Sequence, residues 1–132
     1  MLIVCPSTRR MLLALRNDPI HVWANFGGTI EKYESPLQAA KRELLEEAAF
    51  LEDTHYKMVS NRPILTSQYG HFTYKCYLAI CDTEVEPKLN YEHLDYGWFS
   101  LDALPSDLHF GLKDIVNSEK VLIKIKSVML PI

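Results

Sequence analysis

The segment from Gly28 to Phe50 constrains the fold of this chain more than any other part of it. Ser35 is a candidate helix N-cap, Pro36 falls at the first helical position, and Gln38 stands where it completes a capping box. We therefore predict a helix from Pro36 to about Ala49. Four apolar residues share one face of this helix and are expected to pack on a sheet: Leu37, Leu44, Leu45 and Ala48.

Three glutamates of the same helix, Glu43, Glu46 and Glu47, fall within about one quadrant of its surface at ~100° per residue. Like charges at this spacing repel one another by roughly a few tenths of a kcal/mol per pair, so a sequence selected only for helix stability avoids them. A solvated acidic face is the plain alternative. The choice between this alternative and a metal site depends on the residues that precede these glutamates, namely Gly28, Glu34 and Arg42.

The spacing of these residues carries a family resemblance. The segment reads Gly-x5-Glu-x7-Arg-Glu-U-x-Glu-Glu-x-Gly-U, with U a large aliphatic or aromatic residue, and only Ala49 departs, where Gly is expected. A chance fit is on the order of one in ten million per start point. The pattern resembles the Nudix box of the MutT-type hydrolases. The residues from Trp23 to Phe26 resemble the family's Trp-x-x-Pro before two glycines, with Phe26 in place of Pro.

The resemblance implies a fold, a chemistry and a set of ligands. The fold is the α/β Nudix fold, a mixed β-sheet sandwiched between α-helices. The chemistry is metal-assisted cleavage of a diphosphate bond with Mg²⁺ or Mn²⁺, cations that bind carboxylate and phosphate oxygens together and lower the pKa of a bound water. The implied metal ligands are the Gly28 carbonyl, Glu43, Glu46 and Glu47. Glu46 or Glu47 is the implied activator of water, and the choice between them stays open.

Arg42 and Glu34 resemble the supporting pair of the family. We expect Arg42 to orient the carboxylates, because its planar fork can hold a carboxylate by two hydrogen bonds. A surface ion pair with Glu46, four residues later, is the alternative for Arg42.

Further candidates lie outside the box. Glu92, six residues before Trp98, matches a family glutamate that reaches the metals, and is expected to be a fourth carboxylate or a base; an exposed loop glutamate is the alternative. His93 is expected to be a polar loop residue rather than a ligand. The aromatic residues considered for stacking on a base, with a core position as the alternative for each, are Trp23, Phe26, Tyr69, Phe72 and Phe110.

The remaining sequence predicts short strands and a second helix. The predicted strands are Leu2–Cys5, Met11–Leu15, His21–Phe26, Tyr56–Thr66, Phe72–Cys81 and Tyr96–Phe99, with a hairpin turn at Ser67–Gly70. The second helix is expected from about Ser106 to Asn117, and Val121–Val128 stays open between strand and helix. Strands mixed with helices on both sides indicate an α/β sandwich.

The length of 132 residues predicts one domain over residues 1–132. The three cysteines, with no Cys-x-x-Cys, favour buried reduced thiols. The N-terminus is too short for a signal peptide, and no apolar stretch approaches the ~18 residues needed to span a membrane. We therefore expect a cytoplasmic protein.

The net charge of −3 and the lack of a Lys/Arg run longer than Arg9-Arg10 weigh against a nucleic-acid partner. A small-molecule nucleotide is the expected partner, and a homodimer is allowed. Among substrates, a nucleoside triphosphate is favoured over a dinucleoside polyphosphate or a nucleotide sugar. The alternatives are an RNA 5′-end pyrophosphohydrolase and a non-catalytic nucleotide-binding module of the same fold.

Overall fold

The structure is a computed structural model that describes residues 1–129. Its main sheet contains β1 (Leu2–Cys5), β2 (Arg10–Arg16), β3 (Trp23–Ala24), β4 (Lys57–Met58), β7 (Leu78–Ile80) and β8 (His93–Ser100). The strand order is β3-β2-β1-β7-β4, and β8 also pairs with β2. β1 and β7 are parallel and the other pairs are antiparallel, so the sheet is mixed, as predicted.

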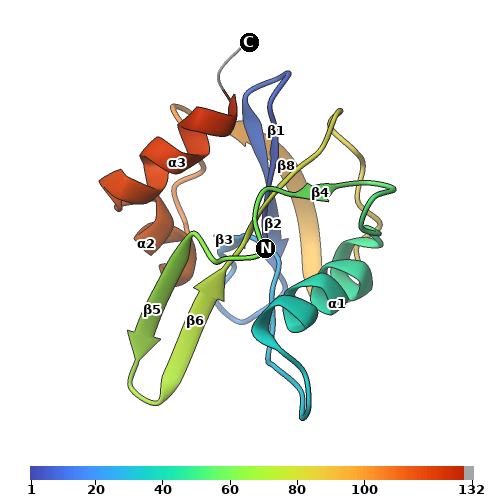
Figure 1. Cartoon of the computed structure of the whole chain (residues 1–132), viewed down its shortest axis with the longest axis vertical. Helices are drawn as coiled ribbons and strands as arrows, with labels where there is room; N and C mark the ends of the chain where they lie inside the picture. The colour runs from blue at the N-terminus through green and yellow to red at the C-terminus, as the bar shows by residue number, and fades with distance from the viewer. Residues whose placement is uncertain (130–132) are drawn as a thin grey trace.

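Helices cover both faces of this sheet (Figure 1). Successive residues of β1 point to opposite faces, so Ile3 joins the core under α1 (Pro36–Ala48) and Val4 joins the other core. The second core is closed by α2 (Phe110–Val116) and α3 (Glu119–Met129). The predicted α/β sandwich is confirmed, and the segment left open at 121–128 is helix.

The helix α1 begins as the sequence predicts. Ser35 accepts a hydrogen bond from the Gln38 N–H, and the Gln38 side chain accepts one from the Ser35 N–H. Ala49 ends the helix in the left-handed region, with φ 59°. The expected burial of Leu45 is wrong: it is 46% exposed, because it lies ~100° around the helix from Leu44.

Several predicted strands are shorter in the structure. The predicted strand His21–Phe26 is reduced to β3. Tyr56–Thr66 divides into β4 and the start of β5, and residues 59–64 between them include Pro63, which cannot donate to a strand ladder. Phe72–Cys81 divides at Tyr77 into two strands of different sheets. The second predicted helix begins only at Phe110, and the predicted strand Tyr96–Phe99 extends back to His93.

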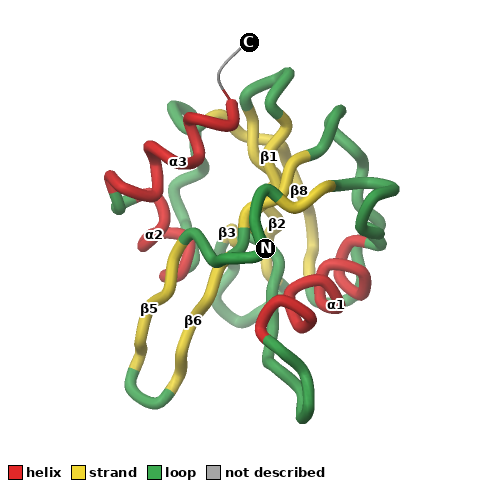
Figure 2. Tube along the Cα trace, in the orientation of Figure 1, coloured by secondary structure: helices red, strands yellow, loops and turns green. Residues whose placement is uncertain are grey.

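A separate hairpin consists of β5 (Leu65–Tyr69) and β6 (Phe72–Cys76). Its turn is Gly70-His71, later than the predicted Ser67–Gly70, and Gly70 has φ +61°. Figure 2 shows this hairpin projecting beside α2, away from the main sheet. The three cysteines are buried and unpaired, as predicted. None of the helices within residues 1–129 is long and apolar enough to cross a membrane.

Candidate active site

Three carboxyl groups meet between α1 and the loop before β8. Glu43 and Glu47 stand one turn apart on α1 and are buried, and Glu92 precedes β8. One ligand atom of each lies within 4.8 Å of those of the other two. Hard divalent cations bind such carboxylate oxygens, so this cluster is the candidate metal centre.

The loop Gly27-Gly28 passes directly over these carboxyls. A Cβ placed on Gly28 would lie 2.5 Å from the carboxyl carbon of Glu43, whereas a Cβ on Gly27 would meet nothing within 4 Å. The Gly27 N–H donates to Glu47 Oε1 at 3.4 Å. Gly28 is therefore needed for the close approach of the backbone to the cluster.

Arg42 ties this loop to the helix. Its Nε and Nη2 donate to the two oxygens of Glu34 at 2.7 and 3.0 Å, and Nη2 also donates to the Thr29 carbonyl at 2.9 Å. Its Nη1 donates to Glu43 at 2.9 Å and to Glu46 at 3.2 Å. The expected two-bonded fork is present on Glu34, and the alternative ion pair with Glu46 is present beside it. The hydrogen bond to Glu34 is the largest cause that raises the pKa of Arg42 and lowers that of Glu34.

Burial and repulsion act on the clustered carboxyls. Burial, followed by the hydrogen bond and charge of Glu43 and the charge of Glu92, raises the pKa of Glu47 to about 9. Burial and the charges of Glu43 and Glu46 also raise the pKa of Glu92. Glu47 Oε2 has no hydrogen-bond partner among residues 1–129. A divalent cation would supply that partner and remove the repulsion, so the donor set fits Mg²⁺ or Mn²⁺.

Glu46 lies at the margin of this cluster. Its side chain is 51% exposed and it is outside the set of Glu43, Glu47 and Glu92, although the sequence placed it among the ligands. Its backbone has a different role. The Glu46 carbonyl accepts from Asn90 Nδ2 at 3.1 Å, and Asn90 Oδ1 accepts from the Glu92 N–H at 2.9 Å. Asn90 thus connects the loop that carries Glu92 to the end of α1. A single asparagine in a loop gives no sequence signal for this role.

His93 is the buried first residue of β8, not the loop residue that was expected. Its Nε2 lies 3.9 Å from Glu47 Oε1, and its ring packs edge-on against Phe26 at 5.2 Å between ring centres. Burial, and then the charge of Arg16, lowers the pKa of His93 to about 4, so the ring is neutral at pH 7. A neutral ring can lie beside the carboxyls without an ion pair.

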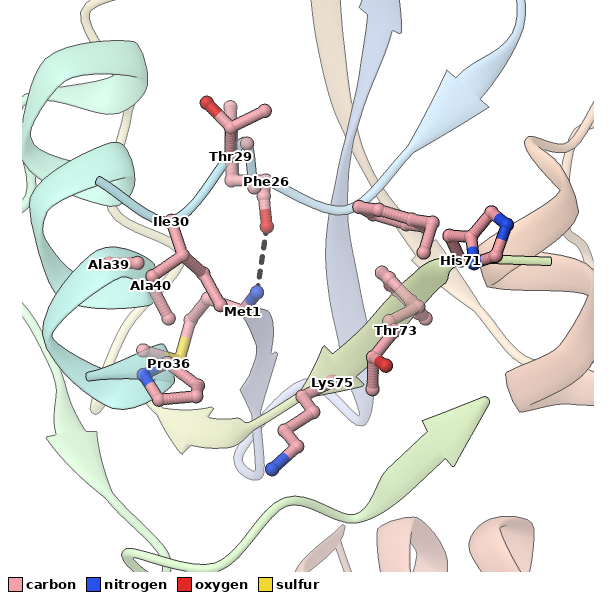
Figure 3. Close-up of a pocket in the computed structure, with 14 residues that line it drawn as sticks. Met1, Phe26, Thr29, Ile30, Pro36, Ala39, Ala40, His71, Thr73 and Lys75 are labelled. Atoms are coloured by element: carbon pink, nitrogen blue, oxygen red, sulfur yellow. Dashed lines mark hydrogen bonds between the residues drawn. The ribbon is translucent and has the colours of Figure 1, made fainter. Parts of the chain in front are cut away.

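A cavity of about 440 Å³ is lined by the Gly27-Gly28 loop together with residues of α1 and β6 (Figure 3). Apolar residues near the start of α1 form one wall and β6 forms the wall opposite. The first wall contains Ile30, Pro36, Ala39 and Ala40. A second cavity of about 220 Å³ holds Glu47 and Glu92 together with Arg16. Gly27 lines both cavities, so the acidic cluster and the larger cavity meet at this residue.

The stacking candidates divide between residues that line the large cavity and residues that pack on other aromatic rings. Phe26 is buried and lines the large cavity, and Phe72, 48% exposed, lines it on the side of β6. Trp23 packs edge-on against Phe99 at 5.2 Å, and Tyr69 against Phe110 at 4.8 Å. Trp23 packs against the second core, the alternative considered for it, whereas Tyr69 lies in neither core; neither residue lines the large cavity.

Comparison with known proteins identifies the fold and the chemistry. The NUDIX domain family model matches residues 1–118. A Haemophilus influenzae protein named dihydroneopterin triphosphate diphosphatase is 34% identical over 111 residues, which cover 74% of this chain and 70% of that protein. These matches support the metal-dependent diphosphatase chemistry that the carboxyl cluster suggests.

Solved structures resemble the chain at lower identity, which concerns the fold alone. A C. elegans Ap4A hydrolase has a TM-score of 0.69 at 21% identity, covering 97% of this chain and 89% of its own. An E. coli dihydroneopterin triphosphate pyrophosphohydrolase has a TM-score of 0.64 at 21% identity, covering 96% and 89%. With its carboxyl cluster, glycine loop and matching domain, the chain belongs to the Nudix family and is a diphosphohydrolase of nucleoside diphosphate derivatives.

Proposed function

We propose that this enzyme hydrolyses the triphosphate chain of a free nucleoside or pterin triphosphate and releases a monophosphate and diphosphate. The observation that carries the proposal is the junction at Gly27 between the carboxyl cluster and a cavity large enough for a bicyclic ring. The relative named dihydroneopterin triphosphate diphosphatase adds a pterin to the nucleoside triphosphates that the sequence favours.

The residues of the cluster have separable roles in this reaction. Glu43, Glu47, Glu92 and the Gly28 carbonyl would hold Mg²⁺ or Mn²⁺, which neutralises charge at phosphorus and lowers the pKa of a water when bound. The water oxygen bonds to one phosphorus, the P–O bond to the bridging oxygen breaks, and that oxygen leaves with the electron pair. A carboxylate accepts the proton of the water. Burial favours Glu47 over the half-exposed Glu46 as that base, and Glu92 is a further candidate by its place in the cluster.

Arg42 has a supporting role in the proposal. Its hydrogen bonds hold Glu34, Glu43 and the Thr29 carbonyl at once, so it fixes the loop over the carboxyls. Fixed carboxyls need no rearrangement when the substrate arrives, which is the main way a protein lowers the barrier of phosphoryl chemistry.

The test is turnover over a panel of substrates with Mg²⁺ and with Mn²⁺, measured as diphosphate or monophosphate release. The panel contains 7,8-dihydroneopterin triphosphate, the four nucleoside triphosphates, a dinucleoside polyphosphate, a nucleotide sugar and a 5′-triphosphorylated RNA. We expect the free triphosphates to be cleaved fastest and a chelator to abolish turnover. Faster cleavage of the RNA end would replace the proposed substrate, and no metal-dependent turnover of any substrate would refute the proposal.

Three further expectations from the sequence stay predictions. They are a single domain over residues 1–132, of which 130–132 lie outside the described residues, a cytoplasmic location, and a number of subunits for which a homodimer is allowed. Light scattering of the purified chain measures the number of subunits directly.

A further inference from the structure

The large cavity has a free hydrogen-bonding edge along β6. Within residues 1–129, β6 pairs with β5 alone, and the two-residue turn closes at the pair Tyr69 and Phe72. In an antiparallel ladder, hydrogen-bonded and non-hydrogen-bonded pairs alternate, and a two-residue turn is closed by a hydrogen-bonded pair. The backbone groups of Thr73 and Lys75 therefore point away from β5, and both residues line the cavity.

The opposite wall of the cavity is apolar. Ile30, Pro36 and the alanines of α1 face β6 across it (Figure 3). A planar ring laid on this wall places its edge against β6. The polar groups along this edge favour one ring edge over another, because a ring group that faces a like group loses its water without gaining a hydrogen-bond partner.

The side chains at this edge are not balanced between donors and acceptors. Lys75 is exposed, forms no ion pair within the described residues and carries three donors with no acceptor. The Thr73 hydroxyl donates to Gln68 at 2.7 Å, and the Tyr74 hydroxyl is paired with Asn25. No aspartate or glutamate lines the cavity. A carbonyl oxygen on the ring can accept from Lys75, whereas an amino group at the same position presents a second donor to it.

We propose that Lys75 is a specificity-determining residue that makes the cavity select rings with a carbonyl oxygen at this edge, namely 6-oxopurines and pterins, over 6-aminopurines. The inference deepens the proposed function, on which it rests for the place of the ring. Guanine and pterin share an oxo group next to a ring N–H, so one cavity of this kind accepts both.

The first experiment measures binding without hydrolysis. The probes are inosine and adenosine 5′-monophosphates, which differ at the 6-position edge and share N7 and the phosphate. The purified protein is titrated with each monophosphate by isothermal calorimetry in the presence of Mg²⁺. The dissociation constant for inosine monophosphate should be roughly tenfold lower than that for adenosine monophosphate. Lys75→Met, which keeps the apolar stem, should remove this preference, and Lys75→Arg should keep part of it. Lys124→Met, on the exposed side of α3, is the matched control.

The second experiment repeats the comparison in turnover. Lys75→Met should raise KM for inosine and guanosine triphosphates and leave kcat unchanged, with little effect on adenosine triphosphate. An equal loss for oxo and amino rings would assign Lys75 to the phosphates and overturn the proposal, as would equal binding of the two monophosphates by the unaltered protein. Because binding is measured separately, absent turnover with intact inosine preference refutes the proposed function and leaves the role of Lys75 standing.

Discussion

The carboxyl cluster and the β6 wall of the large cavity are built in different ways. The carboxyl cluster and the loop above it are held by a hydrogen-bond network, in which Arg42 alone contacts Glu34, Glu43, Glu46 and Thr29. The β6 wall belongs to a two-stranded sheet with an open edge. Rigid carboxyls suit a reaction that is common to a family, and an edge with free backbone groups suits recognition that differs among its members. The comparison separates chemistry from selectivity.

Changing the carboxyls should have the largest effect and tests whether the cluster carries the reaction. Glu47→Gln or Glu43→Gln should lower kcat/KM by roughly three orders of magnitude, about 4 kcal/mol, because the cation loses a ligand. Glu46→Gln should have a smaller effect, since Glu46 lies outside the cluster. Steady-state kinetics with Mg²⁺ and thermal melting measure this. Wild-type turnover in both of the first two variants would remove the assignment of the metal site.

The glycine loop offers a matched pair of variants. Gly28→Ala should push the Glu43 carboxyl aside and lower kcat/KM by about a hundredfold, with little loss of stability, because the displaced atoms end a flexible side chain. Gly27→Ala should change turnover much less, since its Cβ meets nothing. Equal effects of the two changes would mean that the loop is not positioned by contact with Glu43.

The pKa of Glu47 predicts how stability depends on pH. Since the folded-state pKa is raised from 4.5 to about 9, the protonated carboxyl is favoured in the fold. The stability it contributes is full below pH 4.5 and is lost as pH rises toward 9. In the metal-free protein, Glu47→Gln should therefore gain stability relative to the unaltered protein from pH 6 to pH 8.5, by at least about 1 kcal/mol. Urea unfolding at both pH values measures the difference; a constant difference would contradict the raised pKa.

The start of α1 tests the helix that carries Glu43 and Glu47 without changing either residue. Ser35→Ala should cost about 1 kcal/mol of unfolding free energy through loss of the cap. Turnover per folded molecule should stay close to that of the unaltered protein. Chemical denaturation beside kinetics makes this comparison, and unchanged stability would mean that the cap adds nothing.

A change at the end of the same helix should give the smallest effect, a gain in stability where Ser35→Ala gives a loss. Ala49 has φ 59°, a conformation that costs a residue with a Cβ roughly 1 kcal/mol, so Ala49→Gly should stabilise the protein by up to about that amount. The gain in melting temperature should come with unchanged kcat. A loss of stability would show that the side chain of Ala49 contributes packing that outweighs the strain.

The sequence predicted best what is encoded locally. The cap at Ser35, the extent of α1 and the spacing of Glu43 and Glu47 depend on residues within a few positions of one another. The mixed sheet between helices followed from the resemblance and is confirmed. The sequence also named Glu92, by its distance from Trp98, and the structure places it beside Glu43 and Glu47.

What the sequence did not predict depends on contacts between distant segments. Asn90 reaches the end of α1 across 44 positions, and no local pattern marks such a bond. Tyr77 turns the chain from the hairpin into the main sheet inside one apolar run, so periodicity alone could not divide that run. The proposal for Lys75 depends on the open edge of β6, and the sequence of one strand does not show which strands it pairs with.

The shared position of Gly27, on the boundary of both cavities, has a consequence for which bond breaks. A ring bound in the large cavity and a phosphorus bound at the carboxyl cluster are separated by a fixed length of the substrate. The position of the ring therefore decides which phosphorus lies at the cluster. The group beyond the cleaved bond does not change the distance between the ring and that phosphorus. Substrates that share the ring and differ only in this outer group should be cut at the same phosphorus.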